Sequence, residues 1–265
     1  MSNTAYPKGA EKILSGTIDF STAPIKVALV SDAYTYSAAH EFLSSISGRV
    51  GIDQDLTNQS VVGGVFDGDD LDFGMLAPGS VIRAVVIYAA TGNASTSPLL
   101  YHFDSVAGLP MNTNGGGLTV PWDNGPKKIA RLGAPFYPLG ATKQFCGAIN
   151  LSTDTIKAAL LPTSYVYSEA HEFLADLGGV IGTAQTLTSK SIAGGVFAAA
   201  NLDYGSVAAG STVGSIALYK DTGNAASSPL LMHITDVTGF PMNTNGGGLQ
   251  VQWSTGVAKI VKLTA

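Results

Sequence analysis

The amino-acid sequence predicts a mainly β protein built from two homologous antiparallel domains, each a β-sandwich or barrel-like fold with one or two short helices. Three observations support this fold class. The apolar residues gather in short runs rich in β-branched and aromatic residues, glycine-bearing turns separate most of these runs, and the whole pattern occurs twice. The chain has 265 residues, of which 45% are hydrophobic and only 12% charged, so it can bury a large core.

The duplication appears at a constant offset of 131 residues, which relates His40 to His171. Residues 111–118 return unchanged as residues 242–249. About half of the aligned positions are identical, and no insertion or deletion separates the two copies. A unit of this length has the size of a self-contained domain, whereas solenoid repeats are several times shorter.

These copies define the predicted domain organisation. We expect a first domain over residues 6–132, a linker over residues 133–136 and a second domain over residues 137–263. The linker is too short to let the domains move far apart, so we expect their relative placement to be constant.

Within the first copy, five runs have the composition of strands, and the second copy repeats them. They cover residues 25–30, 81–88, 98–103, 118–122 and 128–132. Residues 91–94, Thr-Gly-Asn-Ala, lie between two of these runs, where Gly and Asn tolerate the positive φ that a hairpin requires. We therefore predict antiparallel pairing.

Two stretches of the first copy have helical spacing instead. They are Ala10, Ile13 and Leu14, and then Ala39, Phe42, Leu43 and Ile46 after a Ser37 N-cap. Each domain is therefore expected to contain one or two short helices.

Composition and charge exclude several partners and places. No window of about 18 uninterrupted apolar residues exists, so we expect no membrane partner. Lys and Arg number 14 against 19 acidic residues and form no basic cluster, which disfavours nucleic acid as a partner. Residues 1–10 do not have the pattern of a secretion signal, and Cys146 is the single cysteine. We therefore expect the protein to be made in a cytoplasm.

The histidines raise the question of a metal site, because they form two equivalent pairs. The pairs are His40 with His171 and His102 with His233. Two His and the neighbouring Glu41 would be a ligand set that a catalytic zinc accepts. We favour local hydrogen bonding or packing, because His40 is predicted in a helical turn and His102 within an apolar strand, so the two need not meet.

Two other motifs have weak functional interpretations. Residues 67–72 form the only acidic cluster, but a calcium loop requires a later bidentate Glu that is missing, so we predict a solvated turn. Cys146 falls where the first copy has Ser15, inside a helical stretch, and is not expected to be a nucleophile. We predict no catalytic residue, no metal ligand and no cofactor.

The Asn-Gly-Gly-Gly runs at residues 114–117 and 245–248 do not fit a phosphate-binding loop, because no Lys-Ser or Lys-Thr follows and the next segment is a predicted strand. We predict tight turns or flexible contact loops there. The candidate contact residues are Asn112, Asn114, Gly115, Gly116, Asn243, Asn245, Gly246 and Gly247.

Five stretches of each copy resemble a family of small virion structural proteins of tailed bacteriophages. In the second copy they are residues 155–160, 167–174, 195–197, 218–223 with 228–230, and 239–260. The resemblance covers nearly the whole chain, once per copy. It departs from the family in the tandem arrangement, and residues 88–92 lack the Lys-Asp pair of residues 219–223.

The resemblance implies a non-enzymatic virion component, assembled in the host cytoplasm, that decorates or cements the head shell. Its partners would be the major capsid protein or other virion proteins, with several copies of the chain associating on the particle. Two modules that each bind weakly would together hold a repetitive surface firmly.

Three alternatives remain open. The protein could belong to the tail, neck or a fibre of the particle. It could be a carbohydrate-binding or receptor-binding module in which Tyr34, Tyr36 and Trp122 are stacking platforms, although we expect Trp122 and Trp253 in the core. An enzyme would need a pocket that holds His40 or His102 beside a carboxylate.

Overall fold

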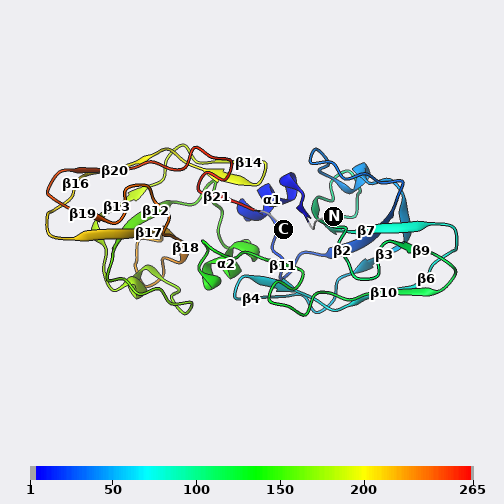
Figure 1. Ribbon diagram of the computed structural model, residues 1–265. Coiled ribbons are helices and arrows are strands. Elements are labelled where there is room, and N and C mark those ends of the chain that lie inside the picture. The colour runs from blue at the N-terminus through cyan, green and yellow to red at the C-terminus, as the bar shows by residue number, and fades with distance from the viewer. Residues whose placement is uncertain (1–3, 264–265) are drawn as a thin grey trace.

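The computed structural model describes residues 4–263 and has two similar groups of antiparallel sheets, one from each copy (Figure 1). Strands account for 38% of the chain and helices for 9%, which confirms the predicted mainly β class. The prediction that residues 1–10 are not a secretion signal rests in part on residues 1–3, which lie outside the described residues. Between residues 4 and 263, no helix is long and apolar enough to cross a membrane.

The elements of the first copy, in chain order, are β1 (Thr4–Ala5), α1 (Pro7–Leu14), β2 (Ile25–Ser31), η1 (Leu43–Ser45), β3 (Arg49–Asp55), β4 (Ser60–Val62), β5 (Val65–Asp67), β6 (Leu71–Met75), β7 (Val81–Ala89), β8 (Leu99–Phe103), β9 (Met111–Asn112), β10 (Gly117–Val120) and β11 (Ala130–Arg131). The second copy has α2 (Pro138–Phe145), β12 (Ile156–Pro162), η2 (Leu174–Leu177), β13 (Ile181–Thr186), β14 (Ser191–Ala193), β15 (Val196–Ala198), β16 (Leu202–Ser206), β17 (Thr212–Lys220), β18 (Leu230–Ile234), β19 (Met242–Asn243), β20 (Gly248–Val251) and β21 (Val261–Lys262).

Each copy has one main sheet and two small ones, all paired antiparallel. The main sheet has the order β1-β8-β7-β2-β3 in the first copy and β13-β12-β17-β18 in the second, with β9 added to β7 and β19 to β17. The predicted hairpin around residues 91–94 joins β7 to β8 and is confirmed. Small sheets β10-β6 and β11-β5-β4 have the counterparts β20-β16 and β21-β15-β14.

The predicted helix over residues 39–46 is wrong, because only the 3-10 turn at Leu43–Ser45 forms there. Ser37 accepts the backbone N–H of Ala39 through its hydroxyl in a local turn, and the chain then extends at Phe42 to bridge Pro98. A Ser side chain that satisfies a nearby backbone N–H offers the chain an alternative to a helix. The chain takes this alternative here, and Phe42 then pairs with Pro98, the residue before β8.

The main sheet of the first copy buries both faces, and its strands alternate between them. Val27 and Leu29 of β2 face the large core, whereas Ala28 and Val30 face a smaller cluster on the outer side of the sheet. The segment between β2 and β3 covers this outer cluster and contributes Tyr34, Leu43 and Ile46 to it. The outer cluster of the second copy has the same construction around Tyr137.

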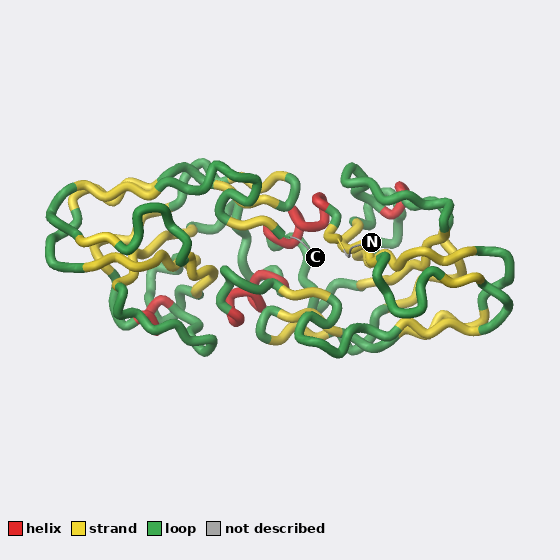
Figure 2. Tube along the Cα trace, viewed as in Figure 1, coloured by secondary structure: helices red, strands yellow, loops and turns green. Residues whose placement is uncertain are grey.

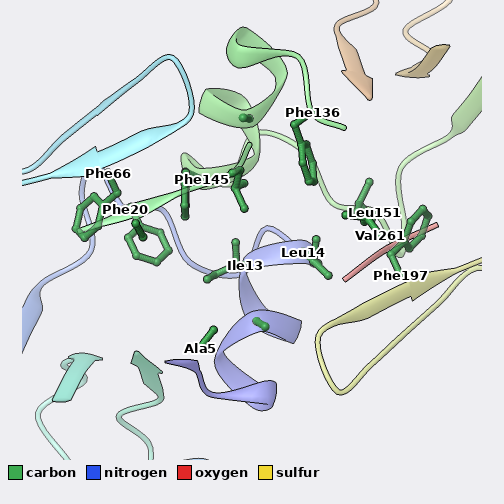
Figure 3. Packing of buried hydrophobic residues seen from close by; sticks show 14 of the residues in the cluster. Ala5, Ile13, Leu14, Phe20, Phe66, Phe136, Phe145, Leu151, Phe197 and Val261 are labelled. Atoms are coloured by element: carbon green, nitrogen blue, oxygen red, sulfur yellow. The ribbon is translucent and has the colours of Figure 1, made fainter. Parts of the chain in front are cut away.

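The large core is shared by both copies. The two short α-helices touch near the middle of the molecule, and each also packs on a hairpin of the other copy: α1 on β14-β15 and α2 on β4-β5 (Figure 2). Figure 3 shows Phe145 of α2 directed toward Phe20 and Phe66 of the first copy. The ring centroid of Phe20 lies 4.7 Å from that of Phe66 and 5.0 Å from that of Phe145.

Polar contacts accompany this exchange of helices. Gly194 donates its backbone N–H to Oε1 of Glu11 at 2.7 Å, and Gly64, which is equivalent to the neighbouring Gly195, donates to Oγ1 of Thr142 at 2.9 Å. Gln144, whose side chain is fully buried, donates from Nε2 to the backbone oxygens of Ile13 and Leu14 at 2.8 and 3.1 Å. The equivalent position in the first copy is Ile13 itself, so the two halves of this contact are not identical.

Each α-helix also lies very close to one strand of its own main sheet, α1 to β8 and α2 to β18. A Cβ at Gly9 would come within 2.3 Å of the backbone oxygen of Leu99, and one at Gly140 within 2.2 Å of that of Leu230. Real Cβ atoms do not approach backbone this closely, so only glycine allows the observed spacing.

Substitution of these glycines tests the close approach. Gly9→Ala or Gly140→Ala forces the helix away from the strand, and we expect each to lower the free energy of unfolding by about 1–3 kcal/mol. Chemical denaturation measures the change. The matched control is Gly133→Ala, whose Cβ would meet nothing within 4 Å. A loss equal to that of the control would contradict the packing.

The Gln144 contact gives a second stability prediction. Gln144→Ala removes both donors from a buried site, and we expect the free energy of unfolding to fall by about 1–3 kcal/mol. Thermal or urea unfolding measures the loss. Gln250→Ala, at an exposed side chain of β20, serves as the control and should change stability little.

Candidate functional site

The predicted contact loops join β9 to β10 and β19 to β20, at the two opposite ends of the elongated molecule (Figure 1). Asn112, Asn114 and their counterparts Asn243 and Asn245 are all exposed. Oδ1 of Asn114 accepts the backbone N–H of Gly116 at 2.9 Å, and the second copy repeats this turn at the same distance. The two ends therefore present the same backbone turn.

A buried threonine anchors each of these loops. Oγ1 of Thr113 accepts the backbone N–H of Ser80 at 3.0 Å, and Thr244 does the same for Ser211. The glycines that follow differ slightly in exposure, since Gly115 is half-buried whereas Gly116, Gly246 and Gly247 are exposed. The predicted tight turn is therefore an ordered loop with a short exposed tip.

The second candidate feature is a hydrogen-bonded chain of aromatic residues on the outer face of the main sheet. The Tyr34 hydroxyl lies 2.7 Å from the hydroxyl of Tyr6 and 2.9 Å from Nδ1 of His40. The second copy has the same chain, with Tyr165 lying 2.9 Å from Tyr137 and 2.8 Å from Nδ1 of His171.

His102 of β8 completes this cluster. Its ring centroid lies 5.9 Å from that of Tyr34 and 5.2 Å from that of Tyr36. The rings of His40 and His102 thus both contact Tyr34, although their positions in the sequence did not require them to meet. We call this cluster the aromatic wall, and its rings are held by hydrogen bonds and packing rather than arranged as metal ligands. It consists of Tyr6, Tyr34, Tyr36, His40 and His102.

Burial favours the uncharged form of several side chains in the aromatic wall and in its counterpart in the second copy. It raises the pKa of Tyr6 and Tyr34 and lowers the pKa of His102 and His233, because the charged forms lose solvation. At neutral pH these side chains are therefore uncharged. They can hold a ligand by packing and neutral hydrogen bonds.

A cleft of about 370 Å³ opens beside this wall in the first copy. Tyr34, Tyr36 and His102 line it together with three charged residues, Asp32, Arg83 and Asp104. No prediction from the sequence pointed to these three. A position-by-position comparison of the copies could have found them, because the second copy replaces all three with uncharged residues.

The tryptophans lie elsewhere, beside a groove that recurs in both copies. Trp122 is 8% exposed and donates its indole N–H to the backbone oxygen of Asp69, as predicted for a core residue. Trp253 donates in the same way to Ala200 but is only half-buried. The adjoining grooves measure about 520 Å³ at Trp122 and 670 Å³ at Trp253. Trp122 offers no open ring face for stacking.

The remaining candidate residues have local partners. Asp69 accepts hydrogen bonds from the side chains of Thr57 and Asn58, and Asp70 accepts the backbone N–H of Trp122. Cys146 is partly buried next to α2, and burial raises the pKa of its thiol. Between residues 4 and 263, no three His, Cys, Asp or Glu residues are grouped as a metal site requires.

Comparison with known proteins adds no family to this description. No family model matches the chain, and no curated protein matches it. The likeness to virion proteins of tailed phages therefore rests on the sequence stretches described above.

The buried histidines predict a pH dependence of stability. The folded state holds the pKa of His102 and His233 below the ordinary value of about 6.5, so the unfolded chain binds protons first. We expect the free energy of unfolding to fall as the pH drops from 7.5 to 5.5. The double variant with His102→Gln and His233→Gln should lose much of that fall, which urea unfolding at both pH values can measure. An unchanged difference would contradict the assignment.

Proposed function

We propose that this chain is a non-enzymatic structural protein of a tailed-bacteriophage particle, most specifically a decoration or cement protein of the head shell. The resemblance of both copies to small virion proteins supports the particle. The arrangement of the two contact loops supports the role, because one chain presents the same ordered turn at both of its ends.

The shared core is what makes this arrangement useful for binding. Phe145 and Gln144 of the second copy are buried against residues of the first copy, so the loops keep one separation. Two binding sites at a constant separation match two equivalent positions of a repeating lattice, and the second contact then forms at high effective concentration. A repetitive shell is the partner that uses this property best.

Lysine substitutions at the exposed last residues of β9 and β19, which lead directly into the two loops, test the proposal. Asn112→Lys or Asn243→Lys alone should weaken binding to empty heads of the same phage by about 100-fold or more, because the bivalent contact becomes monovalent. The double variant should not bind. Cosedimentation with heads measures binding, and Ala38→Lys, at an exposed position outside both loops, is the control.

Two outcomes would contradict the head-shell role. Wild-type affinity of the double variant would show that the loops are not the contact. A protein count of purified particles separates the neighbouring interpretations, since a shell component is present in tens to hundreds of copies, whereas a neck or tail component is present in about a dozen or fewer. Electron microscopy of labelled particles would locate the protein directly.

A further inference from the structure

The cleft beside the aromatic wall of the first copy has the features of a small-molecule site. Its volume of about 370 Å³ falls in the range of ligand pockets, and it combines ring surface with a few polar groups. Tyr36 is half-buried there, which leaves part of its ring open, and His102 packs against it. Burial raises the pKa of Tyr36 and lowers the pKa of His102, which favours the uncharged form of both.

Two of the three charged residues of the cleft have no side-chain partner among the described residues of the fold. Over residues 4–263, the side chains of Asp32 and Arg83 form neither an ion pair nor a hydrogen bond. Asp104 accepts a long hydrogen bond from the hydroxyl of Ser105 at 3.5 Å, and its charge acts on His102 by raising that ring's pKa against the effect of burial. Loss of Asp32 or Arg83 would therefore break no side-chain hydrogen bond or ion pair of the described fold.

The second copy supplies an internal comparison. Its main sheet and aromatic wall are the same, but Thr163, Gly214 and Thr235 stand at the positions of Asp32, Arg83 and Asp104. A copy of the same fold therefore forms without the three charges. The three charges are therefore specific to the first copy and are not required by the fold that the two copies share.

The chemistry of the cleft indicates which ligand it fits. Carboxylates only accept hydrogen bonds and a guanidinium only donates them, whereas each sugar hydroxyl can do both. Two carboxylates beside one guanidinium leave the cleft with a net negative charge, which disfavours an anion. A neutral ring with hydroxyls on its edge and C–H groups on its face satisfies the charged residues and the aromatic wall together.

We propose that the cleft formed by Tyr36, His102, Asp32, Arg83 and Asp104 binds a neutral saccharide, as a mono- or disaccharide unit. This site is separate from the loop tips and does not depend on the head-shell role. A particle protein with such a site would carry a sugar contact in one of its two copies.

Titration of the whole chain with defined sugars tests the site. Calorimetry and saturation-transfer NMR with glucose, galactose, mannose, N-acetylglucosamine, lactose and maltose should show saturable binding of at least one. Arg83→Gly and Asp104→Thr introduce the residues of the second copy, so folding should be preserved. Each should weaken binding by about 10- to 100-fold, since a charged hydrogen bond is lost. Thr235→Ala, at the position equivalent to Asp104, should bind as the wild type does.

Three results would overturn the proposal. The first is no binding of any neutral sugar at about 10 mM, a concentration that detects even millimolar affinity. The second is tighter binding of glucuronate or glucosamine, which would mean a charged ligand. The third is undiminished binding by both Arg83→Gly and Asp104→Thr, which would place the sugar elsewhere.

Discussion

The reciprocal packing of α1 and α2 is the constraint on which the rest of the structure depends. Neither copy closes its core alone, because Phe145 of the second copy fills space beside Phe20 of the first, and Ala10 of the first lies against Gly195 of the second. Burial of apolar surface between the copies is therefore part of folding itself. The same contacts determine how far apart the loop tips stand and in which directions they face (Figure 1).

Much of the fold follows from residue patterns, but the exchange of helices does not. The strands β2, β7 and β8 were predictable because most of their residues are apolar. The duplication was predictable because identical short sequences recur at one offset along the chain. Strand β3 was missed, since its residues are mostly polar and exposed at the edge of the sheet. Ala10 packs on Gly195 and the equivalent Ala141 packs on the equivalent Gly64, so the identical residues of the two copies cannot say which helix packs on which copy.

The candidate sites were predictable to different degrees. The Asn and Gly composition of the loops indicated exposed turns, and the structure places exposed tips there. The contact of His40 and His102 with Tyr34 was not foreseen, because a helix was predicted where the chain is extended. The charged cleft needs residues from three separate segments, which only the folded sheet brings together.

The non-identical contact between Ile13 and Gln144 has a consequence for how such a protein can evolve. In a symmetric dimer of separate chains, every mutation is present in both partners, so it changes the interface at two equivalent places at once. Tandem fusion removes that coupling: a buried amide can arise on one side alone while its neighbour stays aliphatic. One copy of the repeat can then change its surface and acquire a new binding function, while the other copy keeps the original surface.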